Sequence, residues 1–147
     1  EIKMSNKIGG LLITKINFLS GRIFNKMIKK DENIEINHSQ GRILFALSKF
    51  GDMSINDLCM ELSLSKSTLT SMLDRLYITE YIDKRISEKD KRLTIISLKN
   101  KAKEPISKYE KIVSEMEKIY YKDFSEEDIK IFEEYLSRVY KNLEDMD

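Results

Sequence analysis

The chain of 147 residues has the size of one domain or of one subunit of a dimer. Hydrophobic residues make up 41% of it and charged residues 35%, so it can build a core without disulfide or metal support. Lysine and arginine number 26 against 25 acidic residues. The net charge of +1, taken alone, argues against a partner attracted by charge.

Two features of the composition bear on location and fold class. The single cysteine, Cys59, cannot form an internal disulfide, which fits a reducing compartment. No apolar run approaches the roughly 20 residues that span a bilayer, so we expect a cytoplasmic protein with no membrane partner. One proline and five glycines indicate long helices with short connections and disfavour an all-β fold.

The first two predicted helices are defined by apolar spacing and by one capping motif. Residues 8 to 28 place apolar side chains close to one helical face and predict a long first helix. Asn37 and Gln40 form a predicted capping box that begins a second helix. The apolar face of the first helix consists of Ile8, Leu11, Leu12, Leu19, Ile23 and Met27, and the buried stripe of the second consists of Ile43, Leu44 and Leu47.

Two further helices form a predicted helix-turn-helix. Ser54 begins a short helix that should end near residue 62, and Ser65 caps the next one. The short link at Ser63 and Leu64 is the spacing expected of a helix-turn-helix. The inward face of the second helix of this pair consists of Leu69, Leu73 and Leu76.

A hairpin and two long helices complete the chain. Apolar and β-branched residues at 81–82 and 93–98 flank an almost wholly polar stretch, which predicts a β-hairpin with a charged tip at 83–92. From Ile106 to Tyr120, and again from Ile129 to Leu143, apolar positions step alternately by three and four. Such narrow seams suit helix-on-helix packing, including packing between subunits. The predicted fold class is therefore mainly α (α+β).

The charge is distributed unevenly along these elements. Residues 1–62 carry nine basic and seven acidic residues, residues 63–103 carry ten and five, and residues 104–147 carry seven and thirteen. The three segments therefore have net charges of +2, +5 and −6. The positive excess coincides with the elements that would approach a nucleic-acid duplex.

The residue chemistry of this basic segment fits DNA binding. The first turns of a recognition helix meet base edges and phosphates, and small hydroxyl side chains permit a close approach. A basic hairpin tip can follow the backbone or enter the minor groove. The candidate residues are Ser65, Lys66, Ser67, Thr68, Thr70, Ser71 and Arg75 on the recognition helix, and Arg85, Lys89, Asp90, Lys91 and Arg92 on the hairpin.

The order of elements resembles the multiple antibiotic resistance regulator (MarR) family of winged-helix transcription factors. The most specific stretch is LSKSTLTSMLDRL at 64–76, followed without gaps by YIDK at 81–84 and SEKDKR at 87–92. The resemblance implies that Arg92 contacts the minor groove or a phosphate and that Asp90 orients Arg92. Arg75 is a further candidate for orienting Arg92. Glu80 stands where the family usually has glycine, and a left-handed backbone there would cost about 1 kcal/mol.

The resemblance also implies a homodimer that binds double-stranded DNA at a pseudo-palindromic operator, as a repressor, with a small aromatic effector as a further candidate partner. It divides the chain into an N-terminal dimerisation helix (1–35), a winged helix-turn-helix domain (36–100) and C-terminal dimerisation helices (101–147). The apolar seams independently suit this dimer. The expected dimerisation residues are Ile8, Leu12, Leu19, Val113, Met116, Tyr120, Phe132, Leu136, Val139 and Leu143.

Other kinds of site find little support. His38 and Cys59 are too few ligands for a transition-metal site, so we expect no metal and no cofactor, and no catalytic triad can be built around one histidine. We therefore expect no enzyme. Redox sensing by Cys59 stays a minor hypothesis beside a buried structural thiol. The main alternative function is a winged-helix module that has lost sequence-specific DNA binding and binds a protein, as an antirepressor or adaptor does.

Overall fold

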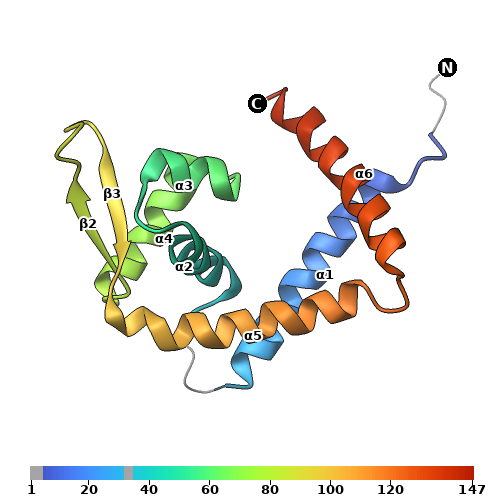
Figure 1. Ribbon diagram of the computed structural model, residues 1–147, viewed down its shortest axis with the longest axis horizontal. Coiled ribbons are helices and arrows are strands. Elements are labelled where there is room, and N and C mark those ends of the chain that lie inside the picture. The colour runs from blue at the N-terminus through green and yellow to red at the C-terminus, as the bar shows by residue number, and fades with distance from the viewer. Residues whose placement is uncertain (1–4, 32–34) are drawn as a thin grey trace. The chain divides into compact units, whose positions relative to one another are not determined.

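The computed structural model describes residues 5–31 and 35–147, and their elements follow the predicted order (Figure 1). The chain divides into two compact units, residues 1–112 and residues 113–147. The predicted division into three parts concerns subunit assembly and stays a prediction. The helices are α1 (Gly9–Lys29), α2 (His38–Phe50), α3 (Ile55–Leu62), α4 (Lys66–Ile78), α5 (Lys103–Tyr120) and α6 (Glu126–Glu144); the strands are β1 (Met53–Ser54), β2 (Ile82–Ile86) and β3 (Thr94–Leu98).

Helices α2, α3 and α4 begin at the caps that the sequence predicts. The Asn37 side chain accepts a hydrogen bond from the Gln40 backbone N–H at 2.9 Å, and Gln40 Oε1 accepts one from Asn37 N–H at 3.1 Å. Ser54 and Ser65 cap α3 and α4 through the backbone N–H groups three residues ahead. Such caps satisfy N–H groups that have no partner within the helix.

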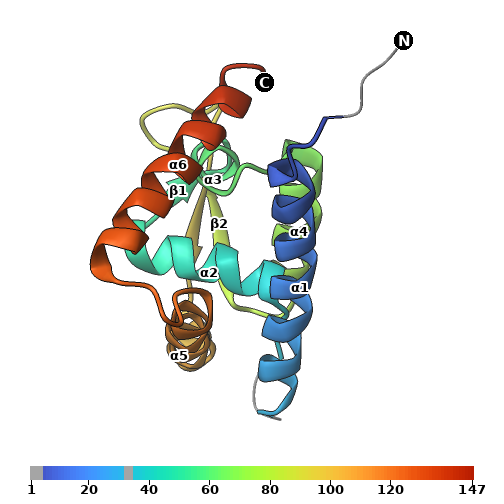
Figure 2. The ribbon, with the colours of Figure 1, turned by 90° about the vertical axis from the view of Figure 1, so that its right-hand side faces the viewer.

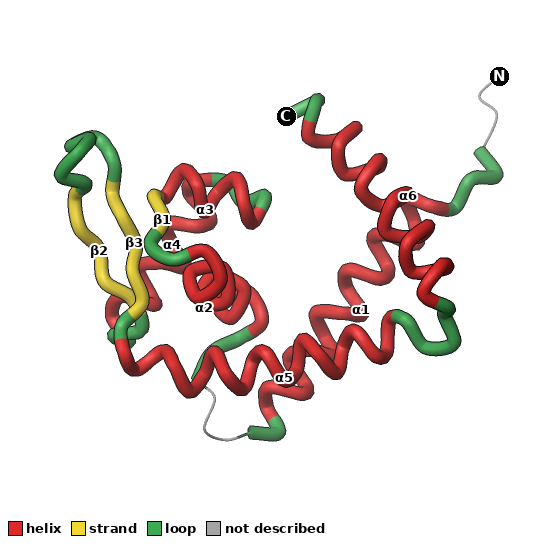
Figure 3. The backbone as a smooth tube through the Cα atoms, viewed as in Figure 1, coloured by secondary structure: helices red, strands yellow, loops and turns green. Residues whose placement is uncertain are grey.

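The sheet contains a strand that the sequence analysis missed. Its antiparallel order is β1-β3-β2, drawn in yellow in Figure 3. Met53 pairs with Ile96 and Ser54 with Ile95, while β2 and β3 form the predicted hairpin. The short strand β1 therefore attaches the hairpin to the start of α3. Strand β2 extends to Ile86, so the connecting tip is shorter than the predicted 83–92.

The core of the first unit lies between the helix-turn-helix and the sheet. The three predicted inward residues of α4 are fully buried, together with Leu58 of α3 and Ile96 of β3. Helix α2 packs against α3 and β3 and lies beside them in both views (Figure 1, Figure 2). Residues of α2, α3, α4, β2, β3 and α5 contribute to this one cluster. The apolar spacing of α2 and α4 is thus explained by packing within this unit.

Helix α4 ends in a backbone conformation that usually requires glycine. Glu80 has φ 65°, which lies in the left-handed region. The Tyr81 N–H donates to the Leu76 carbonyl at 3.0 Å and the Glu80 N–H to the Tyr77 carbonyl at 3.1 Å. These bonds close the end of α4 and fix the direction in which the chain enters β2.

The second unit contains the end of α5 and all of α6. Tyr121, Phe124 and Phe132 meet edge-to-face with ring centroids 5.8 to 6.2 Å apart. Ser125 and Asp128 form a capping box at the start of α6. No residue of α6 is buried, and no helix in the described ranges is long and apolar enough to cross a membrane.

Candidate nucleic-acid interface

Helix α4 presents a polar outer face on a rigid apolar base. Leu69, Leu73 and Leu76 are 0% exposed and fix the rotation of the helix about its axis. The opposite face carries the predicted recognition residues. Thr70 is half-buried, and the other six are exposed: Ser65, Lys66, Ser67, Thr68, Ser71 and Arg75.

Hydroxyl groups organise the first turn of α4. The Ser65 hydroxyl accepts a hydrogen bond from the Thr68 backbone N–H at 3.3 Å, and it donates one to the Thr68 hydroxyl oxygen at 2.9 Å. Ser67 Oγ lies 3.4 Å from Ser65 Oγ. The small side chains leave this end of the helix open to close approach by a ligand backbone.

The amino-terminal turn of α2 lies next to this face. A shallow depression of about 460 Å³ is bounded by residues of both helices, and no carboxylate lines it. The amide oxygens of Asn37 and Gln40 are taken by the capping box, so their NH₂ groups remain as donors. From the sequence, these two residues were recognisable only as a helix cap. The lining residues are Asn37, Ser39, Gln40, Ser67, Thr68, Ser71, Met72 and Arg75.

The hairpin tip holds a bidentate ion pair. Arg92 Nε and Nη2 each lie 3.0 Å from a carboxylate oxygen of Asp90. The Asp90 N–H in turn donates to the Ser87 hydroxyl at 3.2 Å. The side-chain hydrogen bond from Arg92 holds the pKa of Asp90 below its usual value. The Arg92 side chain is 89% exposed, so this pair orients a guanidinium that remains open to a ligand.

Two basic residues of the hairpin are held against the body of the domain. Arg85 lies within β2 and not in the tip, and its Nη2 is 3.1 Å from Asp52 Oδ2. Lys84 Nζ is 2.6 Å from Asp74 Oδ1 of α4. The prediction that Arg85 belongs to the basic tip was therefore wrong, because β2 continues into the polar stretch. Lys89 and Lys91 do lie in the exposed tip with Arg92.

Most predicted dimerisation residues are exposed on their own elements. Ile8, at the start of α1, and Leu12 and Leu19 within it are exposed, although they are large and apolar. On α5, Tyr120 is exposed, Val113 is half-buried and Met116 is buried. The predicted residues of α6, all exposed, are Phe132, Leu136, Val139 and Leu143.

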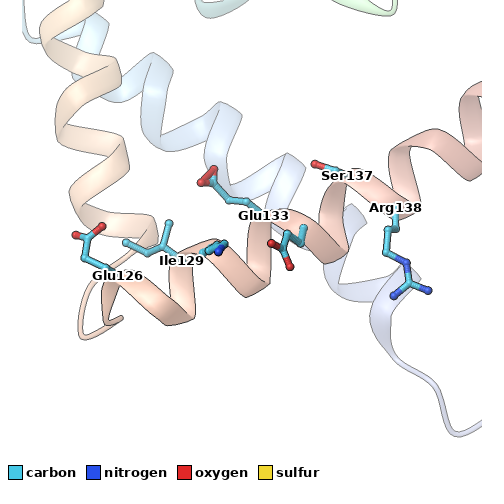
Figure 4. A pocket seen from close by; sticks show the side chains of 7 residues that line it. Glu126, Ile129, Glu133, Ser137 and Arg138 are labelled. Carbon is cyan, nitrogen blue, oxygen red and sulfur yellow. The ribbon is translucent and has the colours of Figure 1, made fainter.

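The charged face of α6 has no comparable organisation. Figure 4 shows acidic and basic side chains side by side along this helix, among them Glu126, Glu133 and Arg138. Within the described residues, no three His, Cys, Asp or Glu side chains are grouped so that they could hold a metal ion. Cys59 is half-buried and packs against the core of the first unit. His38 is the first residue of α2, as expected.

A helix-turn-helix joined to a β-hairpin beside its second helix defines a winged-helix protein. The model of the MarR family matches residues 36–94, which span α2 to the start of β3. This part of the chain is therefore similar to the MarR family, and the chain has the winged-helix fold. A search of curated protein sequences returned no match.

Three solved structures extend the likeness beyond the matched region. A MarR protein from Peptoclostridium difficile is 19% identical with a TM-score of 0.83, over 99% of this chain and 94% of its own. A mutant MarR from E. coli complexed with operator DNA is 21% identical with a TM-score of 0.78, over 88% and 91%. The Streptomyces coelicolor regulator PcaV, in complex with its natural ligand, is 17% identical with a TM-score of 0.81, over 95% and 98%. At these identities the likeness establishes the fold.

Proposed function

We propose that this protein is a cytoplasmic DNA-binding transcriptional regulator that represses by binding a pseudo-palindromic operator as a homodimer. The observation that carries the proposal is the exposed polar face of α4 beside a hairpin tip whose Asp90 holds Arg92 outward. A MarR with this fold binds operator DNA, which supports the same role here.

Each element has a defined task in the proposed complex. The first turns of α4 enter the major groove, where Lys66 pairs with a phosphate and Ser67 and Ser71 permit close approach. The hairpin tip follows the adjacent backbone or minor groove with Arg92. The segment 63–103, with its net charge of +5, faces the duplex, and the acidic segment 104–147 does not.

The homodimer is supported by exposed apolar residues on α1 and α6. Large apolar side chains on a soluble chain mark surfaces that another protein covers. Residues 1–35 and 101–147 therefore form the dimer in this proposal, and residues 36–100 read the DNA. The two copies of α4 should enter successive major grooves about 34 Å apart, one turn of the double helix.

The proposed repressor is released by a small aromatic effector. Support comes from the ligand-bound PcaV structure, which has the same fold. Screening small aromatic acids for release of a bound operator tests this part separately. If no compound releases the DNA, the effector is removed from the proposal while DNA binding stands.

Selection of bound duplexes from a random-sequence pool tests the main proposal. We expect a two-fold symmetric consensus whose half-sites are about one helical turn apart. The logarithm of affinity should fall linearly with that of salt concentration, by about 0.9 for each phosphate neutralised. Absence of any binding at low salt, together with capture of a specific partner protein by the purified chain, would favour the adaptor function instead.

Two matched arginine variants test the assignment of the tip. Arg92→Ala should weaken DNA binding and reduce the salt slope by about 0.9, without lowering the melting temperature. Arg85→Ala should change DNA binding less, because Arg85 is held by Asp52 on the strand. Equal losses of affinity in the two variants would contradict the distinction between tip and strand.

A further inference from the structure

Helix α1 is attached to the rest of the first unit through very few side chains. Of its 21 residues, only Phe24 and Ile28 are buried. The Phe24 ring stacks on the imidazole of His38, with centroids 4.0 Å apart and planes at 26°. It also lies 5.2 Å from the ring of Tyr109. We call Phe24, His38 and Tyr109 the His38 cluster, which joins α1, α2 and α5.

Hydrogen bonds place the His38 ring at the centre of this cluster. The Tyr109 hydroxyl oxygen is 3.0 Å from His38 Nδ1. The His38 backbone N–H donates to Asn25 Oδ1 of α1 at 3.1 Å. One residue thus contacts α1 through its ring and its backbone, and α5 through its ring. A change at this imidazole acts on both contacts at once.

The surroundings favour the neutral imidazole. Burial lowers the pKa of His38 from its ordinary value, and the positive charge of Arg42, one turn further along α2, lowers it again. Among the described neighbours, α1 contributes the uncharged Phe24 and Asn25, and α5 contributes the Tyr109 phenol.

One charged side chain next to Tyr109 in the chain is engaged in ion pairs of its own. Lys108, beside Tyr109 on α5, is paired with Asp31 at 3.1 Å and with Glu104 at 3.4 Å. No carboxylate is therefore shown in contact with the His38 ring among the described residues. A proton added to this ring would be a partly buried positive charge near that of Arg42.

Protonation also changes the hydrogen bond to α5. When the ring is neutral with its proton on Nε2, Nδ1 accepts from the Tyr109 hydroxyl. When Nδ1 gains a proton it can only donate, so the Tyr109 hydroxyl has to turn and accept. The added charge and the reversed bond both act against the packed arrangement.

We propose that the His38 cluster is a proton-sensitive joint, in which protonation of His38 loosens α1 from α2 and α5 and thereby weakens DNA binding. The inference rests on the proposed function: α1 belongs to the proposed dimer, and α2 begins the DNA-reading part. His38 is the only histidine in the chain. Histidine is the side chain whose ordinary pKa lies between about 5 and 8, and the ordinary pKa of a cysteine thiol such as that of Cys59 lies just above this range. A proton is therefore a ligand that this site can distinguish.

The single histidine allows a test that needs no substitution. Its imidazole C–H resonance can be followed by NMR through pH in the free protein and in the complex with a duplex recovered by selection. We expect a lower pKa in the complex, with about tenfold in affinity for each pKa unit of difference. Cross-relaxation between the Phe24 and His38 rings should weaken as His38 becomes protonated. Equal pKa values in the two states overturn the proposal.

Affinity measurements with variants provide the second arm. Lowering the pH from about 8 to about 5 should weaken binding of the same duplex by wild type about fivefold, the lower end of typical coupling between sites. His38→Asn keeps a polar group near the position of Nδ1 and should abolish most of this dependence. Ser48→Asn, an exposed change on the same helix, should keep the wild-type profile.

The outcomes separate this inference from the proposed function. Binding that is equally pH-dependent in wild type and in His38→Asn overturns the joint and leaves the DNA-binding function standing. Absence of binding to any duplex at low salt at every pH refutes the function itself. A folded His38→Asn variant, judged by its melting curve, is required for the comparison, and the wild-type NMR titration decides the matter without it.

Discussion

Replacing Glu80 with glycine is expected to stabilise the protein, because a glutamate occupies a left-handed backbone conformation at the end of α4. Relief of this conformation contributes about 1–2 kcal/mol to the free energy of unfolding. The greater freedom of glycine in the unfolded chain offsets about 0.5–1 kcal/mol of that gain. A net stabilisation of about 0.5–1 kcal/mol should raise the melting temperature by about 1–4 °C in a chain of this size.

Urea and thermal unfolding at one fixed protein concentration measure this effect, because the stability of a dimer depends on concentration. Glu80→Ala retains the Cβ atom but removes the carboxylate, so it should remain near wild type. Glu88→Gly introduces glycine at an exposed position of the tip that is not left-handed, and it should not stabilise. If Glu80→Gly melts at or below the wild-type temperature while Glu80→Ala is unchanged, the strain argument is refuted.

Three further predictions follow from packing and titration. Gly41→Ala should destabilise the protein by about 1–3 kcal/mol, because a Cβ there would collide with the Tyr109 ring. Gly21 has open space around it, so Gly21→Ala should be neutral or stabilising in the same thermal unfolding measurements. Leu73→Ala, at a fully buried position, should lower stability by about 2–5 kcal/mol in urea, and a smaller loss would mean that the site collapses around the change. The pKa of His38 is lowered in the folded state, so its contribution to stability should be complete above the unfolded pKa of 6.5 and lost as the pH falls to the folded-state pKa. His38→Asn should flatten this part of the profile of stability against pH. An unchanged profile would exclude His38 as the titrating group.

Local patterns predicted most of the helical framework. Helix starts were predictable because a cap such as Asn37 or Ser65 satisfies N–H groups within three residues of itself. The buried face of α4 was predictable because its leucines recur with the helical period. No local pattern indicates the left-handed conformation of Glu80, and the comparison with the family's glycine only raised it as a condition.

The missed features depend on contacts between distant segments. Strand β1 has two residues, too few to show an alternating pattern, and Met53 pairs with Ile96 far along the chain. Strand β2 was partly read as a loop because the three charged residues 83–85 separate Ile82 from Ile86, so the sequence shows no alternation of apolar and polar residues there. This error moved Arg85 into the tip. The stacking of His38 on Phe24 likewise brings together residues that no sequence spacing connects.

Strand β1 also limits the ways in which binding can be regulated. It anchors β3 to the start of α3, while Asp52 and Asp74 hold the other strand of the hairpin through Arg85 and Lys84. These contacts hold the recognition helix α4 and the β2–β3 hairpin together as one unit in each copy. A signal that leaves these contacts intact cannot change the angle between α4 and the hairpin within one copy. In the proposed dimer such a signal would change the distance between the two DNA-reading units. It would therefore alter the fit to half-site spacing more than the choice of bases within a half-site.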